Sequence, residues 1–447
     1  MIRDKIATNV LKYVQSKIAS PVIIEVDRSY FRDVLAEVRQ YAFDIPKTII
    51  RLVEREFPFF FSRVLEIPMF NMIATILPRE VIFDYAEDPR IVKIYRDGIK
   101  YALQYPIVPP EGVFKIRRKG KDWLFTSTYW TKKLVGGDVA NSKGFTGRGV
   151  KVAVLDTGIS YIHEQVRGKF VGLSSYPTGP EDVNGHGTWC ASCIAGRKAV
   201  DDMLSRLSGG HVECEGVAPD AELISVKVLD FVVGAGSDSA IIKGVEMAVS
   251  RGAKVLSLSL GGPVDAKNEE DDPYFKVFSD VVERGVIPVV AAGNEGPDES
   301  TVGTPGAITP VLTVGSTDPI TGEIAPYSSR GPTPWGSIKP DVVAPGGGYP
   351  DKGIDSAITG MLDTAGDGVL NRYSPIQGTS MATPHCAGLV TCAVQMYRDV
   401  LGIDLTLDEI KKMMESLGHS KTNDDGWGFI HWGLFEEWVA TQYGVKM

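Results

Sequence analysis

Four short apolar runs in the second part of the chain constrain its fold most strongly. Each run is continuous rather than alternating and rich in β-branched residues, which is typical of strands buried on both faces of a sheet. Helix-like segments such as AIIKGVEMAVSRG (240–252) lie between them. The sequence therefore predicts an α/β domain with a mostly parallel sheet flanked by helices. The runs are KVAVLD (151–156), AELISVKVL (221–229), AKVLSLSL (253–260) and VIPVVAAG (286–293).

Before about residue 120 the composition differs, with aromatic and charged segments and few glycines. Period-2 runs and helical spacing alternate there in the order β-α-β-β-α-β, which predicts a ferredoxin-like α+β unit. This order alone indicates no function. The predicted strands are residues 21–26, 62–69, 70–78 and 90–97, and the predicted helices are residues 30–43 and 79–88.

A boundary is expected between these two parts. The segment YPIVPPEGVFKIRRKGKDW (105–123) carries three prolines and several charges, which favours an extended, exposed linker. We therefore expect a first domain over residues 1–103, a linker over 104–125 and a second domain over 126–447.

Charge and hydropathy exclude two classes of partner. Lys+Arg number 47 against 56 Asp+Glu, a net charge of -9, and the short basic run at 118–121 is too small to neutralise several phosphates. Nucleic acid is therefore not expected as a partner.

The longest uncharged stretch, 374–397, contains too many polar residues to span a bilayer. The first 20 residues have charged helical spacing rather than a secretory signal, so we expect an intracellular protein unless a signal was removed.

The five cysteines are an odd number, so at least one is unpaired within the chain. Three interpretations stay open: buried packing thiols, one disulfide between Cys193 and Cys214, and a redox or metal role for the Cys190-x-x-Cys193 pair. The remaining two cysteines are Cys386 and Cys392.

Four polar residues stand at the ends of the apolar runs or at the starts of predicted helices, where ligands of open α/β sheets collect. Asp156 closes the first run, and Asn294 follows the last. His186 lies between two glycines at a helix start, and imidazole is a natural base for a hydroxyl near neutral pH. Ser380 begins a helix whose free N–H groups suit an oxyanion. The ordinary alternatives are a helix N-cap for Ser380 and a turn residue for Asn294.

Asp, His and Ser follow one another in the chain order of subtilisin, with an Asn between His and Ser. Five segments resemble, in order, the signature segments of the subtilisin-like serine proteases, or subtilases, and the resemblance covers roughly residues 126–447. The segments are VAVLDTGIS (152–160), NGHGTWCASCIAG (184–196), SLSLGG (257–262), VVAAGNEG (289–296) and GTSMATPHCAGL (378–389).

The resemblance implies a role for each of the four residues. Ser380 resembles the nucleophile, His186 the general base and acid, and Asp156 the carboxylate that orients the imidazole. Asn294 resembles the oxyanion donor beside the Ser380 N–H. No cofactor is expected for this chemistry, and turnover should rise through a group at about pH 6 to 7 as His186 loses its proton.

The resemblance also implies an extended polypeptide substrate that pairs between two segments of the enzyme. No charge occurs among the residues predicted to line the pocket before the cut, which favours an apolar or broad preference. The predicted substrate-binding residues are Ser259, Leu260 and Gly261 in one segment and Gly234, Ala235 and Gly236 in the opposing segment, and the pocket is predicted to be lined by Leu260, Gly261, Ala291 and Gly293.

The sequence departs from the family pattern in four places. Trp189 and Cys190 replace a usual His and Val after the catalytic His, and the polar stretch 197–215 is longer than the loop that holds calcium in many relatives. An insertion lies between residues 345 and 374. Within it Asp363 and Asp367, with Asn371, are candidate Ca²⁺ ligands, and a plain polar turn is the alternative.

With a subtilase behind it, the first domain resembles the family's propeptide, an intramolecular inhibitor that assists folding. We expect a monomeric serine endopeptidase made as a zymogen that cleaves itself between about residues 97 and 125. A permanent N-terminal domain is the alternative. Two other functions compete: a non-catalytic subtilase fold used for binding, and a transpeptidase or exopeptidase with the same triad.

Overall fold

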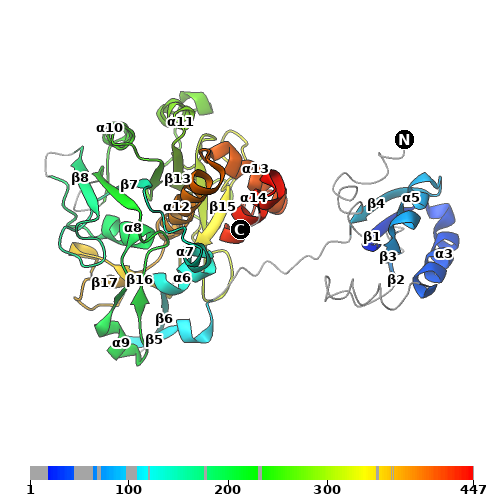
Figure 1. Cartoon of the computed structure of the whole chain (residues 1–447), viewed down its shortest axis with the longest axis horizontal. Coiled ribbons are helices and arrows are strands. Elements are labelled where there is room, and N and C mark those ends of the chain that lie inside the picture. The colour runs from blue at the N-terminus through cyan, green and yellow to red at the C-terminus, as the bar shows by residue number, and fades with distance from the viewer. Residues whose placement is uncertain are drawn as a thin grey trace. The chain divides into compact units, whose positions relative to one another are not determined.

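The computed structural model divides the chain into two units, Met1–Ala102 and Leu103–Met447 (Figure 1). The helix-like spacing expected at the N-terminus falls on residues 1–18, which lie outside the described residues. The structure describes residues 19–44, 64–67, 72–96, 108–118, 121–175, 179–229, 234–348, 352–363, 365 and 367–445.

The first unit contains a four-stranded antiparallel sheet with strand order β2-β3-β1-β4. Both of its described α-helices share one buried core with the sheet, in which Ile24, Val38 and Ile82 are fully covered. The two helices therefore cover the same face. The elements and their order match the sequence-based expectation. They are β1 (Ala19–Val26), a 3₁₀ turn η1 (Arg28–Tyr30), α3 (Phe31–Asp44), β2 (Val64–Ile67), β3 (Met72–Pro78), α5 (Arg79–Glu87) and β4 (Ile91–Arg96).

The second unit is built on a seven-stranded sheet with strand order β15-β14-β13-β12-β7-β11-β8. Every pair of neighbours in it is parallel, as the continuous apolar runs predict. The chain begins this sheet at β7, builds toward β8, and then crosses to the other side of β7 to continue with β12. The strands are β7 (Lys151–Asp156), β8 (Phe170–Ser174), β11 (Glu222–Lys227), β12 (Val255–Leu258), β13 (Ile287–Ala291), β14 (Leu312–Thr317) and β15 (Val342–Pro345).

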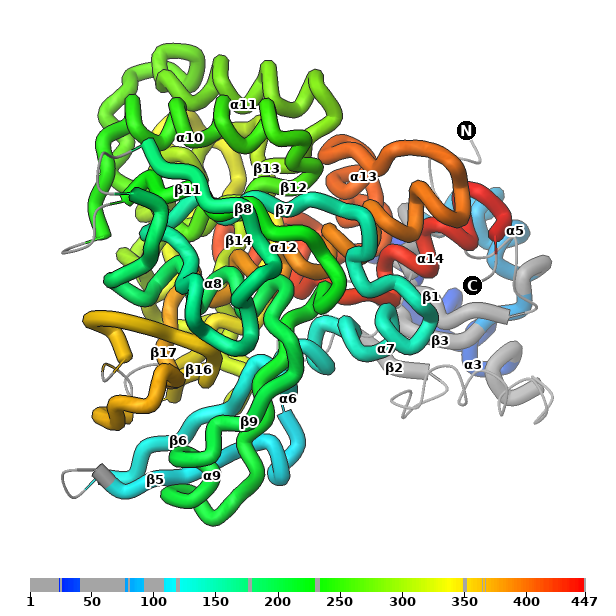
Figure 2. Tube along the Cα trace, turned by 60° about the vertical axis from the view of Figure 1, so that its left-hand side comes forward, coloured from blue at the N-terminus to red at the C-terminus, as the bar shows by residue number. Residues whose placement is uncertain are grey.

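Helices cover both faces of this sheet, which confirms the predicted α/β architecture. Along β7, Val152 and Val154 enter a core shared with α8, α12, α13 and α14, whereas Ala153 and Leu155 enter a second core with α10 and α11. Figure 2 shows α10 and α11 side by side over one face. The helices are α6 (Thr128–Leu134), α7 (Gly137–Ser142), α8 (His186–Ala195), α9 (Asp202–Ser208), α10 (Asp238–Ser250), α11 (Pro273–Glu283), α12 (Thr379–Met396), α13 (Leu407–Leu417) and α14 (Trp432–Tyr443), with short turns η3 (Pro110–Gly112), η4 (Glu269–Asp271), η5 (Gly360–Leu362) and η6 (Tyr397–Leu401).

A second sheet in this unit, with order β17-β16-β6-β5, joins distant parts of the sequence. Its strand β16 belongs to the insertion at 345–374 and pairs in parallel with β6, Lys352 opposite Leu124. The strands are β5 (Phe114–Arg118), β6 (Lys121–Ser127), β16 (Lys352–Ala357) and β17 (Tyr373–Ile376), and a separate hairpin pairs β9 (Ala199–Val200) with β10 (Glu213–Cys214).

This second sheet corrects the expectation of an exposed linker over 104–125. Residues 114–118 and 121–125 lie in strands of the second unit, and Val108, Phe114 and Phe125 are buried. The prolines and charges of the segment favoured a linker, but alternate side chains of both strands face a core. The partner strand β16 lies more than 200 residues away, so no local pattern indicated the pairing.

All five cysteines lie among the described residues and are buried free thiols. The Cys193–Cys214 disulfide is therefore not formed, and each thiol occupies packing space. None of the helices in the described ranges has the length and apolar character needed to span a membrane.

Truncation of Phe125 tests whether β5 and β6 belong to the cooperative unit. The Phe125 ring is 2 % exposed and stacks on Phe114 with centroids 5.5 Å apart. We expect Phe125→Ala to lower the free energy of unfolding by about 3–5 kcal/mol, measured by urea denaturation in a Ser380→Ala background, which removes the predicted nucleophile. Lys121→Ala, at an exposed site of the same strand, is the control. A loss below about 1 kcal/mol at Phe125 would show that the pair of strands unfolds separately.

Candidate active site

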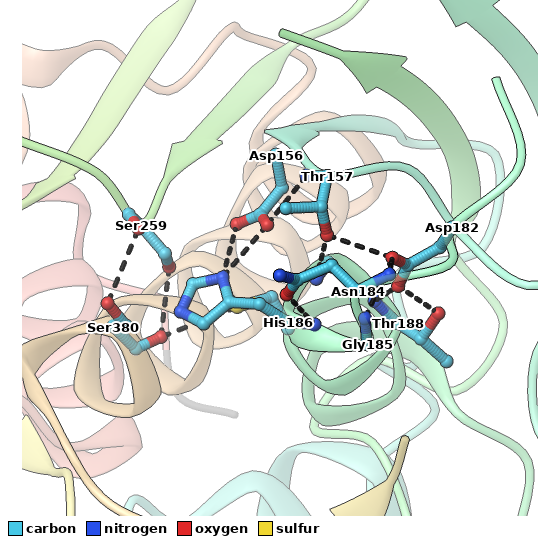
Figure 3. Close-up of polar contacts among 11 residues, drawn as sticks. Asp156, Thr157, Asp182, Asn184, Gly185, His186, Thr188, Ser259 and Ser380 are labelled. Atoms are coloured by element: carbon cyan, nitrogen blue, oxygen red, sulfur yellow. Dashed lines mark hydrogen bonds and ion pairs between the residues drawn. The ribbon is translucent and has the colours of Figure 1, made fainter. Parts of the chain in front are cut away.

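The candidate site lies where the strand order of the large sheet reverses. Asp156 ends β7, and Ser259 directly follows the neighbouring strand β12. Ligands of open α/β sheets bind at this kind of reversal, beyond the carboxyl ends of the strands. His186 is the first residue of α8 and Ser380 the second residue of α12, and Figure 3 shows both close to the two strand ends.

The Asp156 carboxylate is hydrogen-bonded to the His186 ring. The His186 Nδ1 atom lies 2.8 Å from Oδ1 and 3.0 Å from Oδ2 of the Asp156 carboxylate. The Thr157 backbone N–H also donates to Oδ1, at 2.7 Å. The Asp156 side chain is 1 % exposed and that of His186 is 21 % exposed. The carboxylate is thus enclosed, while one edge of the imidazole reaches the cleft.

The Asp156 carboxylate fixes the charge and tautomer of the imidazole. Burial alone would lower the pKa of His186, but the negative charge of Asp156 and its hydrogen bond raise that pKa well above 6.5. Donation from Nδ1 to Asp156 leaves Nε2 on the side of Ser380, and Figure 3 shows the ring between these two residues. We therefore expect His186 to titrate above the range of about pH 6 to 7 that the sequence suggested.

Ser380 is half-buried at the start of α12, and its hydroxyl is turned toward β12. Its Oγ donates to the Ser259 carbonyl at 3.3 Å, and the Ser259 hydroxyl donates back to the Ser380 carbonyl at 2.9 Å. Side-chain rotamers interchange in picoseconds to nanoseconds, so the Ser380 Oγ atom is able to leave the Ser259 carbonyl. Hydrogen bonds between a nucleophile and its base are often long in unliganded enzymes.

Asn294 is held in one orientation by the turn that precedes Ser380. Its Oδ1 accepts hydrogen bonds from the backbone N–H and the hydroxyl of Thr379, both at 2.9 Å. A backbone N–H can only donate, so this bond identifies the anchored atom as the amide oxygen. The Nδ2 donors of the exposed amide are therefore presented to a ligand.

Two cavities adjoin these residues and share the segment 260–263. The first, of about 630 Å³, is lined by His186 and Ser259, and the second, of about 560 Å³, by Asn294 and Ser380. The structure brings every predicted substrate-binding residue to one of them. Gly234, Ala235, Gly236 and Ser259 line the first, Ala291 and Gly293 the second, and Leu260 and Gly261 both.

The comparisons with known proteins decide the family. The model of the subtilase family matches residues 147–428, more than half of the chain. The chain belongs to the subtilase family. It is 36% identical over 304 residues to the serine protease AprX of Bacillus subtilis (strain 168), an alignment that covers 64% of the chain and 65% of AprX. It is 34% identical over 308 residues to subtilisin Savinase of Lederbergia lenta, covering 68% of the chain and 97% of that relative.

This subtilisin-like serine protease has a more acidic cleft than its sequence indicated. Glu295 lines the second cavity, and Asp238 and Asp265 line the first, beside the uncharged residues predicted for the pocket, so the apolar or broad preference stays a prediction. The signal for Glu295 was available, because it directly follows Asn294 in the chain. The two aspartates follow no local motif and come to the cleft through the fold.

Trp189 and Cys190, the two departures after His186, lie behind the site. The fully buried Trp189 donates from Nε1 to the carbonyl of Ile354 in β16, at 3.2 Å. The Cys190 Sγ atom lies 4.0 Å from His186 Nδ1 and 3.5 Å from the Ser380 carbonyl oxygen. The indole therefore connects α8 to the insertion, and the thiol fills the space beneath base and serine.

The predicted calcium ligands serve the backbone of their own loop. Asp363 Oδ1 accepts from the Asn371 N–H at 3.2 Å, and Asp367 Oδ1 accepts from the Val369 N–H at 2.8 Å. The Asn371 amide donates to Asp201 instead, at 2.8 Å. Among the residues that the structure describes, the metal-ligand atoms of three His, Cys, Asp or Glu side chains gather within 4.8 Å at one place, which is Asp156, His186 and Cys190. Calcium at Asp363 and Asp367 thus stays a prediction.

The raised pKa of His186 can be measured in the Ser380→Ala protein by following its imidazole resonances with pH. We expect titration above pH 6.5 and a downward shift in Asp156→Asn, because burial then acts without the opposing charge. His385 is the internal control, since burial lowers its pKa to about 4 and its ring contacts Thr131 and the Met381 carbonyl instead. Titration of His186 below 6.5 with Asp156 intact would contradict the electrostatic argument.

Proposed function

We propose that this subtilase is an endopeptidase that hydrolyses internal peptide bonds through an acyl-enzyme on Ser380. One observation carries the proposal: the His186 imidazole, held at 2.8 Å by Asp156, lines the first cavity, and Ser380 and Asn294 line the second, which shares the segment 260–263 with the first. This supports a nucleophile, a base and an oxyanion donor that act on one scissile carbonyl.

Each group has one task in the proposed reaction. His186 Nε2 takes the proton of the Ser380 hydroxyl as Oγ bonds to the substrate carbonyl carbon, and the negative charge of Asp156 stabilises the imidazolium. The carbonyl electron pair moves onto oxygen, where Asn294 Nδ2 and the Ser380 N–H donate to it. The imidazolium then protonates the leaving amine as the C–N bond breaks. A water molecule, deprotonated by His186, releases the acyl group by the reverse path.

The substrate is proposed to bind as an extended strand between residues 234–236 and 259–261. Pairing with main-chain groups does not require a free chain end, which favours cleavage inside a polypeptide. The two cavities on either side of the shared segment 260–263 then receive different side chains of the substrate.

The first unit is proposed to be a propeptide that the enzyme removes itself. The division between the two units falls after Ala102. From Val108 onward the described chain belongs to the second unit, since the buried Val108 donates its N–H to the Pro319 carbonyl at 2.9 Å. A cut before Val108 leaves the second unit whole, which narrows the earlier expectation of 97 to 125.

Mass spectrometry of the purified full chain tests self-processing. We expect the wild type to acquire a new N-terminus before Val108, whereas Ser380→Ala stays at full length when purified without other proteases. The processed wild type should cleave casein, and a serine-directed sulfonyl fluoride should block this. A Ser380→Ala chain that processes at the same site and rate would sink self-cleavage. An inert processed wild type would favour a binding protein of the same fold.

Removal of the Asn294 amide tests the oxyanion donor. We expect Asn294→Ala to lower kcat by about 10²- to 10³-fold with little change in KM, as for the corresponding donor of subtilisin, because its hydrogen bond forms to the oxyanion. Steady-state kinetics on a chromogenic peptide measure this. Asn268→Ala is the matched control, since the Asn268 amide contacts Asp271 on the surface, outside both cavities. A less than threefold change in kcat for Asn294→Ala would remove this residue from the reaction.

A further inference from the structure

A second buried carboxylate, Asp182, lies beside the catalytic group and touches no substrate cavity. Its side chain accepts five hydrogen bonds, and the residue is 2 % exposed. Oδ1 accepts from the N–H groups of Asn184 and Gly185 at 3.0 and 2.9 Å and from the Thr157 hydroxyl at 3.0 Å. Oδ2 accepts from the N–H and hydroxyl of Thr188 at 2.9 and 2.6 Å. Four of the five donors belong to residues on either side of His186 in the sequence, and the fifth is Thr157.

Thr157 connects this carboxylate to the strand that carries Asp156. Its hydroxyl donates to Asp182 and accepts the Gly187 N–H at 2.9 Å, while its own N–H donates to Asp156. One side chain therefore ties the end of β7 to the first turn of α8. Figure 3 shows Thr157 between the two aspartates, with Asp182 facing the turn before the histidine.

The backbone of the turn around His186 packs directly against the backbone of neighbouring segments, with no room for a side chain at Gly185 or Gly187. A Cβ on Gly187 would lie 2.2 Å from the Gly158 carbonyl oxygen, and one on Gly185, at φ 114°, would lie 2.1 Å from the Thr359 carbonyl oxygen. Strand end, turn and helix start therefore touch through main-chain atoms. The hydrogen bonds of Asp182 determine how the turn sits in this contact.

Within the part of the chain that the structure describes, no Lys or Arg side chain forms an ion pair with Asp182, so the five hydrogen-bond donors must stabilise its charge. Burial raises the pKa of Asp182, and its bonds with Thr188 and Gly185 oppose that rise. Hydrogen bonds to a carboxylate are shorter and stronger than neutral ones. An Asn at this position would turn N–H groups toward some of the same donors. The site therefore requires a carboxylate and is sensitive to an isosteric change.

We propose that Asp182 is a positioning residue for the reaction: through Thr157 and the 184–188 backbone it sets the place of the His186 ring between Asp156 and Ser380. This inference rests on the proposed catalytic role of His186. Displacement of a catalytic group by about 1 Å costs on the order of 10²-fold in rate, so the effect falls on kcat. We expect Asp182→Asn to change substrate binding much less than kcat, because the Asp182 side chain lines neither cavity.

A matched aspartate distinguishes positioning from simple helix capping. Asp201 is also buried, caps α9 by accepting the Leu204 N–H at 2.9 Å, and accepts one side-chain amide. Asp201→Asn removes charge from a buried cap outside both cavities, so it controls for lost stability.

The test measures kcat and KM of the processed enzyme. The concentration of active sites, needed for kcat, is determined by burst titration. We expect kcat to fall about 10- to 100-fold in Asp182→Asn, with KM within about twofold. We expect a similar fall in kcat in Thr157→Val, but its KM is not used as a criterion because Thr157 lines the first cavity. Thr157→Ser, which keeps the hydroxyl, should recover most of the rate, and Asp201→Asn should match the wild type. Thr157→Val also serves if Asp182→Asn does not fold.

Two outcomes would overturn the proposal. One is unchanged kcat per titrated site in both Asp182→Asn and Thr157→Val, with losses only in folded fraction. The other is an equal fall in kcat for Asp201→Asn, which would make the effect one of general stability. An inactive wild type would instead indicate failure of the proposed function, and the His186 titration in Ser380→Ala then still reports whether Asp182→Asn moves the ring. A lowered pKa of His186 is expected there, because a displaced ring loses its contact with Asp156.

Discussion

The reversal of strand order between β7 and β12 is the constraint on which the candidate site depends. The two strands are parallel neighbours, yet the chain leaves β7 toward one side of the sheet and returns to build β12 on the other. Their carboxyl ends therefore form a crevice that no crossover helix fills. Asp156 and Ser259 stand at its two edges, and α8 and α12 begin beside it. The Ser380 hydroxyl donates to the Ser259 carbonyl, and the Ser259 hydroxyl donates to the Ser380 carbonyl. These two hydrogen bonds hold the start of α12 against the end of β12.

Two buried carboxylates have different partners in this crevice. Asp156 is hydrogen-bonded to the imidazole of His186, and Asp182 accepts hydrogen bonds from backbone N–H groups and hydroxyls. The first raises the pKa of His186, whereas the second fixes the turn from which His186 projects. Burial raises the pKa of Asp182, and the negative charge of Asp156 raises it further. Ample hydrogen bonding at Asp182 is what allows two acids to share one buried region.

Sequence reasoning predicted the large sheet and the four catalytic candidates because both have local signals. Continuous apolar runs identify strands buried on both faces, and the polar residues at their ends lie within short motifs. The second sheet had no such signal, since β6 pairs with β16 across more than 200 residues. Asp182 lies two residues before the segment 184–196 that contains His186, but its five hydrogen bonds, from four residues, form only in the folded turn. The pKa of His186 likewise depends on burial, which only the structure supplies.

The insertion at 345–374 and the segment 108–127 act together on the active-site helix. Their strands β16 and β6 pair with each other, and β16 meets α8 through Trp189 and the Ile354 carbonyl. A second contact, between the Ser192 and Ser356 hydroxyls at 2.7 Å, joins the same two elements. Loss of β6 would leave one edge of β16 unpaired, and β16 supports the far side of the helix that begins at His186. A cut inside 108–127 would therefore disturb the position of His186 through three packed elements, which is a physical reason to expect the proposed processing cut before Val108.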